Sequence, residues 1–231
     1  MLPVRYARTG GVATVTMDDG KANALSPAML GAVNDALDRV EKDDVAAAVL
    51  AGRPGRFSAG FDLNVLRAGG SEAVAMVRGG FELAERLLGF PRPIVVACTG
   101  HAMAMGSFLL CAADHRVGAA GDFKIQANEV AIGITMPYSA LALLRYRLTP
   151  AAFDRAVGLS ALFTPAAAIS AGWLDDVVDL DAVVPAAQSI ASSLAGLDPA
   201  AHAASKRRAR ADVLAEVRRG IESSTSELAP T

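Results

Sequence analysis

The chain has 231 residues, 52% of them hydrophobic and 20% charged, which excludes an intrinsically disordered protein and is enough for one large domain or two small ones. Lysine and arginine number 22 against 24 for aspartate and glutamate, and 5% of the residues are aromatic, so no nucleic acid is expected as a partner.

Strand and helix patterns alternate in the first part of the chain. Residues 12–17 predict a strand, and Ser26 followed by Pro27 predicts the N-cap and first residue of a helix. The next elements expected are a buried strand at 45–52, a loop at 53–63, a helix at about 71–88, a strand at 93–98, a helix at 106–114, a strand at 115–119, and a strand with a loop at 123–130.

The apolar stretch 94–113 is long enough to cross a bilayer. Gly100 and His101 interrupt it, and its halves predict a strand and a helix, so no membrane segment is expected. The N-terminal residues lack the apolar core of a signal peptide, and Cys98 and Cys111 lie in apolar runs, which is typical of buried, reduced thiols. We therefore expect a cytoplasmic protein. The three histidines show no ligand spacing, so no metal site is expected.

From Tyr138 onward the pattern is nearly all helical. Thr149-Pro150 and Thr164-Pro165 each predict an N-cap and a helix-opening proline, and residues 173–180 predict a short extended piece. Residues 198–220 predict one amphipathic helix, and 221–231 a frayed end. This order predicts an α/β core at 1–190 and a helical region at 191–231, and an amphipathic tail of this kind often packs on another subunit.

Two turns have the features of anion-binding loops. Gly60 permits a sharp turn that would point the Phe61 N–H into a cavity. The second turn precedes the helix near Gly106, where the Met105 N–H has no partner inside the helix. Two such donors that converge on one point would form an oxyanion hole. Asp62 is expected to cap the helix that follows its loop.

Several motifs resemble the crotonase superfamily, the enoyl-CoA hydratase/isomerase family, in order and spacing. They are KANALS at 21–26, RPGRFSAGFDL at 53–63, GHAMAMGSFLLCAADHRVG at 100–118, FKIQANEVAIGITMP at 123–137 and FTPAAAISAGWLDDVV at 163–178. The resemblance implies a crotonase-like α/β spiral of ββα units with a helical C-terminal oligomerisation region, in a homotrimer or a dimer of trimers.

The resemblance also implies an acyl-CoA thioester as the substrate, with CoA as part of it and no further cofactor. By alignment, the N–H groups of Phe61 and Met105 would hold the thioester oxygen and Glu129 would be the catalytic carboxylate. The other implied roles are CoA binding by Lys21, Ala22, Ala24 and Ala59, and an acyl pocket formed by Met103 and Phe108.

Two positions depart from the family pattern. Met105 stands where glycine is usual, and Phe108 stands where the hydratases have their other glutamate. A double-bond shift from C3 to C2 needs one base, whereas hydration uses two carboxylates well, so the leading hypothesis is a Δ3,Δ2-enoyl-CoA isomerase of fatty-acid metabolism. The alternatives are an enoyl-CoA hydratase that uses Glu129 alone and a catalytically weak acyl-CoA-binding protein.

Several further positions have open interpretations. Glu82 or Glu85 would replace the missing glutamate if either faced the acyl pocket, although a solvated helix face is the simpler interpretation. Lys206 and its neighbouring arginines, or Arg53 and Arg56, are candidates for contacts with the CoA phosphates. His101 is expected to be a hydrogen-bonded residue near the core.

Overall fold

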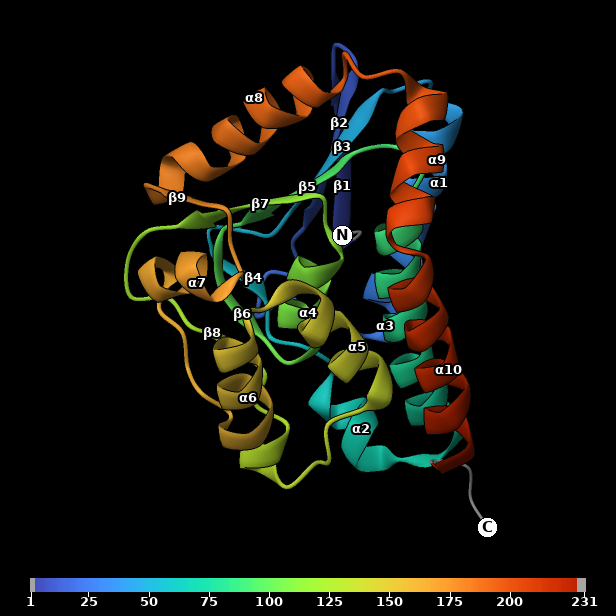
Figure 1. Cartoon of the computed structure of the whole chain (residues 1–231), viewed down its shortest axis with the longest axis vertical. Helices are drawn as coiled ribbons and strands as arrows, with labels where there is room; N and C mark the ends of the chain where they lie inside the picture. The colour runs from blue at the N-terminus through green and yellow to red at the C-terminus, as the bar shows by residue number, and fades with distance from the viewer. Residues whose placement is uncertain (1–2, 228–231) are drawn as a thin grey trace.

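The computed structural model describes residues 3–227 (Figure 1). Its strands are β1 (Val4–Thr9), β2 (Val12–Met17), β3 (Ala47–Ala51), β4 (Gly55–Ser58), β5 (Ile94–Cys98), β6 (Gly100–Met103), β7 (His115–Ala119), β8 (Ile125–Gln126) and β9 (Asp176–Val178). Its helices are α1 (Pro27–Lys42), α2 (Leu63–Ala68), α3 (Gly70–Gly89), α4 (Met105–Ala112), α5 (Tyr138–Arg147), α6 (Pro150–Leu159), α7 (Pro165–Ala171), α8 (Val183–Leu194), α9 (Pro199–Ala209) and α10 (Ala211–Glu227), with 3-10 helices η1 (Val130–Ile132) and η2 (Leu180–Ala182).

The strands form two sheets, and the chain alternates between them. The larger sheet has the order β1-β2-β3-β5-β7-β9 and the smaller one the order β4-β6-β8. β1 pairs with β2 antiparallel, and every other pairing between these strands is parallel. Each of the pairs β3–β4, β5–β6 and β7–β8 therefore places one strand in each sheet before the chain turns into helix, which gives the expected spiral of ββα units.

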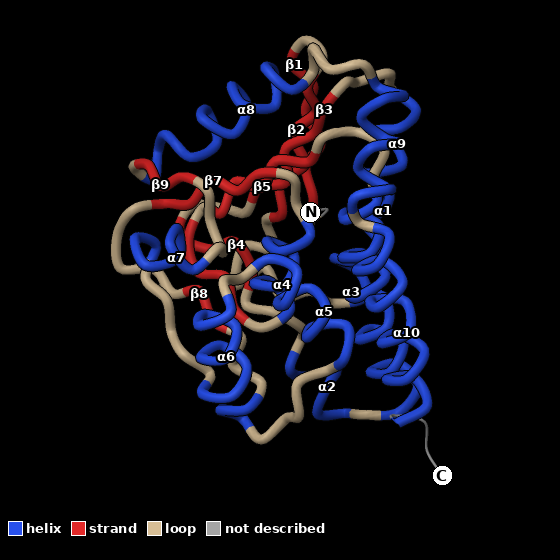
Figure 2. The backbone as a smooth tube through the Cα atoms, in the orientation of Figure 1, coloured by secondary structure: helices blue, strands red, loops and turns tan. Residues whose placement is uncertain are grey.

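Both faces of the larger sheet are covered. On one face, Val183, Ala187 and Ala191 of α8 pack against Val49 and Val95 of the sheet. The opposite face belongs to the main core, which also takes the buried sides of α1, α3, α4 and α5. Figure 2 shows α8 on one side of β5, β7 and β9, with α4 and α5 on the other side. The alternating small and branched residues of these buried strands suit this two-sided packing.

The C-terminal helices pack on the core of the same chain. α10 lies along α3 and α5 (Figure 1). The approach is close, because a β-carbon at Gly220 would lie 2.4 Å from the backbone nitrogen of Ser139. The Ser139 hydroxyl also donates a hydrogen bond to the carbonyl of Val217 at 3.0 Å.

A buried ion cluster holds α9 and the start of α10 to the sheet. The Asp114 carboxylate accepts from Lys206 Nζ at 2.6 Å and from Arg210 at 2.9 Å, and it also accepts from the Ile94 N–H at 2.7 Å. Burial, only partly offset by Asp114, lowers the pKa of Lys206 to about 8.

Several expected elements match closely. α1 begins at Pro27, and the Ser26 hydroxyl accepts from the Met29 N–H at 3.2 Å. Asp62 caps α2 by accepting from the Asn64 N–H at 2.8 Å. Cys98 and Cys111 are buried and free.

Other expectations were wrong in detail. Residues 53–63, expected to be a loop, contain the strand β4. The strand β6 begins directly after Thr99, where no strand was expected. The single helix expected at 198–220 is two helices that meet at Arg210. The helical path continues to Glu227, so 221–227 is not a frayed end, and 228–231 lies outside the described residues. The division into a core at 1–190 and a helical region at 191–231 stays a prediction, and residue 190 lies inside α8.

Among the described residues, no single helix is long and apolar enough to cross a membrane. The bent pair Leu180–Leu194 and Pro199–Ala209 meets the criteria of length and composition only when its halves are taken together.

Candidate active site

Three parallel strands of the smaller sheet end at the same edge, and each leads to one of the candidate residues. Phe61 follows β4, Met105 follows β6, and Glu129 follows β8. Because carboxyl ends of neighbouring parallel strands share one edge, the fold brings these three positions together from distant parts of the sequence.

The two candidate oxyanion loops, which carry Phe61 and Met105, touch each other. Gly60 has a φ of +87°, and a β-carbon there would lie 2.9 Å from Cβ of Ala104 and 3.3 Å from the Met105 nitrogen. Only glycine therefore permits this approach. Among the described residues, no acceptor is found for the N–H of Phe61 or of Met105. Both donors remain available to an oxygen placed between the loops.

The side chain of Met105, which stands where the family usually has glycine, is fully buried beside α3. Its Cγ would lie 3.5 Å from a β-carbon at Gly80. Met105 is also the first residue of α4, so its N–H has no partner within the helix. The preceding residue, Ala104, has φ +46° and ψ −125°, a strained conformation for a residue with a β-carbon.

Asn23 anchors the loop at 21–26. It is completely buried, and its amide donates to the carbonyls of Met17, Arg56 and Phe57 at 2.9–3.2 Å. The backbone carbonyl of Asn23 accepts a hydrogen bond from the hydroxyl of Ser58 at 2.8 Å. Residues 21–26 and the first oxyanion loop are therefore fixed to each other through one buried amide.

Ser58 lies between the two oxyanion loops. Its hydroxyl accepts from the Gly60 N–H at 3.2 Å, and a β-carbon at Gly106 would lie 3.0 Å from that oxygen. Asn23 and Ser58 were not singled out from the sequence. The signal that could have found them is their place inside two of the motifs, KANALS at 21–26 and RPGRFSAGFDL at 53–63.

The expected CoA-contacting residues lie along this loop system. The Ala59 N–H donates to the Ala22 carbonyl at 3.0 Å, and Ala59 and the side chain of Lys21 are exposed. Ala24 is partly buried next to Leu25, whose N–H donates to the Gly60 carbonyl at 2.8 Å.

Glu129 is 7% exposed, and its Oε2 is buried with no hydrogen-bond partner among the described residues. Burial raises the pKa of Glu129 to about 7, although a hydrogen bond from its own backbone opposes the rise. A carboxyl group with this pKa can both accept and return a proton near neutral pH.

An apolar wall lies next to the oxyanion loops. The ring of Phe61 makes an edge contact with Phe81 at 6.3 Å between centroids, and Phe81 stacks on Phe108 at 6.1 Å. Phe108 is 1% exposed, whereas Met103 is partly exposed. Phe108 therefore backs the wall, and no carboxylate occupies its position.

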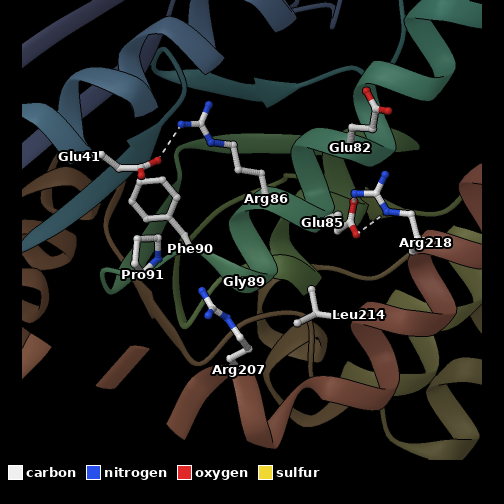
Figure 3. Close-up of a pocket in the computed structure, with 10 residues that line it drawn as sticks. All are labelled: Glu41, Glu82, Glu85, Arg86, Gly89, Phe90, Pro91, Arg207, Leu214 and Arg218. Carbon is white, nitrogen blue, oxygen red and sulfur yellow. Dashed lines mark hydrogen bonds and ion pairs between the residues drawn. The ribbon is translucent and has the colours of Figure 1, made fainter. Parts of the chain in front are cut away.

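Glu82 and Glu85 face away from these loops. They are among the residues that line a pocket of about 470 Å³ at the junction of α1, α3, α9 and α10 (Figure 3). Glu82 pairs with Arg78 on the same helix at 2.8 Å, and Glu85 pairs with Arg218, which also lines the pocket. The lining of this pocket includes no residue of the oxyanion loops or of the Glu129 segment. Glu82 thus lies on a solvated helix face, whereas Glu85 is largely buried in its ion pair with Arg218.

The basic candidates for phosphate contacts differ in their availability. Lys206 is buried in its pair with Asp114, which removes it from the surface. Arg53 donates to the Lys21 carbonyl at 2.7 Å and therefore supports the loop at 21–26. Arg56 is exposed and lies in β4.

His101 accepts a hydrogen bond from the Lys124 N–H at 3.0 Å and packs edge-on against Phe123, as expected for a hydrogen-bonded histidine near the core. Within the described residues there is no cluster that would hold a metal ion.

Comparisons with known proteins agree with this architecture. The sequence profile of the enoyl-CoA hydratase/isomerase family matches residues 7–228. An apo structure of an Mtb enoyl-CoA isomerase is 50% identical, covers 98% of this chain and 99% of that one, and has a TM-score of 0.94. An enoyl-CoA hydratase, EchA3, from Mycobacterium marinum is 48% identical, covers 98% and 100%, and has a TM-score of 0.95.

A probable enoyl-CoA hydratase, echA17, from Mycobacterium avium (strain 104) is 34% identical over 217 residues, which are 92% of this chain and 82% of that protein. The two-sheet spiral and C-terminal helices of this chain are therefore the fold of those structures.

Proposed function

The chain belongs to the enoyl-CoA hydratase/isomerase family, and we propose that it is the isomerase kind of enzyme, which shifts the double bond of a 3-enoyl-CoA to the 2-position. The observation that carries the proposal is the buried Glu129 carboxylate, whose Oε2 has no hydrogen-bond partner among the described residues, in a site where Phe108 occupies the position of the family's other glutamate.

In the proposed mechanism, the N–H groups of Phe61 and Met105 bind the thioester oxygen of the substrate. Their two hydrogen bonds stabilise negative charge on that oxygen and make the C2 proton more acidic. Glu129 removes the C2 proton, which gives a dienolate with its charge on the held oxygen. The protonated Glu129 then gives the proton to C4, which leaves the double bond between C2 and C3 and returns the carboxylate.

The surroundings of Glu129 suit a mechanism in which the same carboxylate removes a proton and then returns it. Burial of the carboxylate raises its pKa to about 7, which improves it as a base while it remains largely ionised above neutral pH. Phe108, which stacks on Phe81, offers no carboxylate at the position of the second family glutamate to activate a water molecule. The proton that Glu129 returns therefore goes to C4 of the dienolate, and water is not added to the double bond.

We further propose that CoA lies along Lys21, Ala22, Ala24 and Ala59, and that Met103 and Phe108 contribute to the acyl pocket. Arg56 is the best-placed of the candidate phosphate contacts, because its side chain is exposed beside the first oxyanion loop. A homotrimer or a dimer of trimers remains the predicted assembly, which molar mass from light scattering would measure.

The first test uses trans-3-enoyl-CoA and, separately, trans-2-enoyl-CoA with the wild type and with Glu129→Gln. The wild type is expected to form the conjugated 2-enoyl product, and the variant to lose roughly 10²–10⁴-fold in kcat, as removal of a general base does. The absorbance of the conjugated thioester follows both reactions. Unchanged isomerisation by Glu129→Gln would contradict the assignment of the base.

Hydration is the second candidate, because two of the similar proteins above are described as hydratases. Loss of the conjugated absorbance from the 2-enoyl substrate, with little conversion of the 3-enoyl substrate, would establish a hydratase that uses Glu129 alone. Tight acyl-CoA binding without turnover of either substrate would instead indicate a binding protein.

A further inference from the structure

The segment that carries Glu129 has little packing of its own. It runs from the two-residue strand β8 through Glu129, the N-cap residue, into the three-residue helix η1, and residues 130–135 are exposed. Inside the segment, the Glu129 carbonyl accepts from the N–H groups of Ile132 and Ile134 at 3.1 and 2.9 Å. So short a 3-10 turn is weak by itself, and contacts from elsewhere must hold it.

Ser160, at the end of α6, contacts this segment on both sides of Glu129. Its carbonyl accepts from the Gln126 side-chain amide at 2.7 Å. Its hydroxyl accepts from the Ala131 N–H at 3.1 Å. One residue thus binds positions three before and two after the carboxylate.

The register between the two segments is fixed by a backbone pair. Ile125 and Phe163 exchange two hydrogen bonds, each of 3.0 Å. Ser160 therefore meets the Glu129 segment at a defined position, and not as an incidental contact between loops.

Gln126 extends this connection to the oxyanion hole. Its carbonyl accepts from the Ala104 N–H at 2.9 Å, and Ala104 directly precedes Met105. Through Gln126, the Ser160 carbonyl is two hydrogen bonds from the backbone of the second oxyanion loop. The spacing between the base and the Met105 donor depends on this short path.

The backbone of Ser160 is in an unusual conformation for its residue type. It is left-handed, with φ +46° and ψ +41°, and the residue is 7% exposed. Glycine is favoured in this conformation and would fit without strain, but it has no hydroxyl to offer Ala131. A strained backbone at a buried serine, where glycine would relieve the strain, indicates that the serine hydroxyl has a function.

We propose, on the basis of the proposed function, that Ser160 is a positioning residue for Glu129, acting through Gln126 and Ala131 to hold the carboxylate at a fixed distance from the oxyanion donors. It does not touch the reacting atoms. Small displacements of a catalytic group are costly, since an error of about 1 Å can lower a rate by about 10²-fold.

The experiment compares Ser160→Gly with the wild type. The variant removes the hydroxyl and relieves the left-handed strain, so it should fold at least as well. We expect kcat for the 3-enoyl substrate to fall by roughly 10-fold or more, with KM changed by less than about 2-fold, because ground-state binding is untouched. Amide hydrogen exchange should become faster at 126–134 and remain unchanged elsewhere.

Asp44→Gly is the matched control. Asp44 also has a left-handed backbone, with φ +49°, but it lies in the exposed turn between α1 and β3. This variant relieves the same kind of strain and should leave kcat and exchange at 126–134 unchanged. Gln126→Leu, which breaks the bond to the Ser160 carbonyl, should reproduce the Ser160→Gly effects.

The outcomes separate this proposal from the proposed function. If the wild type turns over neither enoyl-CoA, the isomerase proposal fails, and the exchange measurement still decides whether Ser160 holds the Glu129 segment. Unchanged exchange at 126–134 in Ser160→Gly, or a fall in activity with faster exchange throughout the chain, would overturn the positioning role.

Discussion

At the scale of single residues, the Glu129 carboxylate is buried, and its Oε2 has no hydrogen-bond partner in the described part of the chain. Its ordinary pKa is near 4.5 and rises to about 7 in the folded protein, so the folded state binds an extra proton between those values. Stability contributed by that site is therefore lost as the pH rises through this window. The folded protein tolerates an ionised, desolvated carboxylate above neutral pH, which is the form that acts as a base.

This predicts that Glu129→Gln stabilises the protein while it removes activity. A pKa difference of this size corresponds to a gain of about 3 kcal/mol at pH 8 and less than about 1 kcal/mol at pH 5. Urea unfolding of both proteins at the two pH values measures the gain. A gain that is the same at both would show that the ionisation of Glu129 is not its source.

At the scale of elements, α3 shapes the first oxyanion loop through one small residue. A β-carbon at Gly80 would lie 2.3 Å from the Phe61 ring, whereas one at the adjacent Gly79 would meet nothing closer than Leu30 at 3.7 Å. The two glycines occupy the same helix, but only Gly80 makes room for the ring that follows the oxyanion turn.

Gly80→Ala and Gly79→Ala therefore form a matched pair. Alanine in a helix interior gains up to about 1 kcal/mol over glycine, and Gly79→Ala should show that gain with normal kcat. Gly80→Ala should displace Phe61 and lower kcat by roughly 10-fold or more, because the oxyanion donor moves with its residue. Thermal unfolding and the isomerase assay measure both effects. Equal activities in the two variants would contradict a role for Gly80 in shaping the loop.

The elements that the sequence predicted well are those with long periodic patterns or clear caps. α1 has Ser26 and Pro27 at its start, and the buried strands β3 and β5 are apolar runs. β4 and β6 have four residues each and start with glycine, so neither carries a readable alternation. β4 and β6 form strands because they pair with each other, and β6 also pairs with β8. These partners are far apart in the sequence, so the sequence pattern does not reveal the pairing.

The candidate site likewise contains residues that the sequence indicated and residues that it did not. The resemblance to the family indicated Phe61, Met105 and Glu129, and the structure places all three beyond the ends of paired strands. Asn23, Ser58 and Ser160 support these positions through side-chain bonds to distant backbone groups. Such bonds leave no period in a sequence, because each links one residue to a partner about 30 or more positions away.

At the scale of the whole molecule, the Asp114 cluster joins the sheet to both C-terminal helices. Lys206 comes from α9, Arg210 from the junction with α10, and Asp114 from the start of β7. Both cations are largely buried, so loss of the shared carboxylate would leave two charges without their partner.

Asp114→Asn is expected to lower the free energy of unfolding by about 3 kcal/mol or more, as loss of a buried partner does. Glu82→Gln is the control, because its pair with Arg78 is exposed and is worth less than about 1 kcal/mol. Urea unfolding at pH 7 measures both. A loss no larger in Asp114→Asn than in Glu82→Gln would mean that the cluster does not secure the helices.

The packing of α8 and α10 has a consequence for synthesis on the ribosome. Strands β2, β3, β5 and β7 are made before α8, which covers one of their faces, and α3 and α5 are made before α10, which lies along them. During translation, apolar strand and helix surfaces are therefore exposed while their covers are still untranslated. The nascent chain is most exposed to aggregation in this interval, and folding can be completed only after residues beyond 211 have emerged.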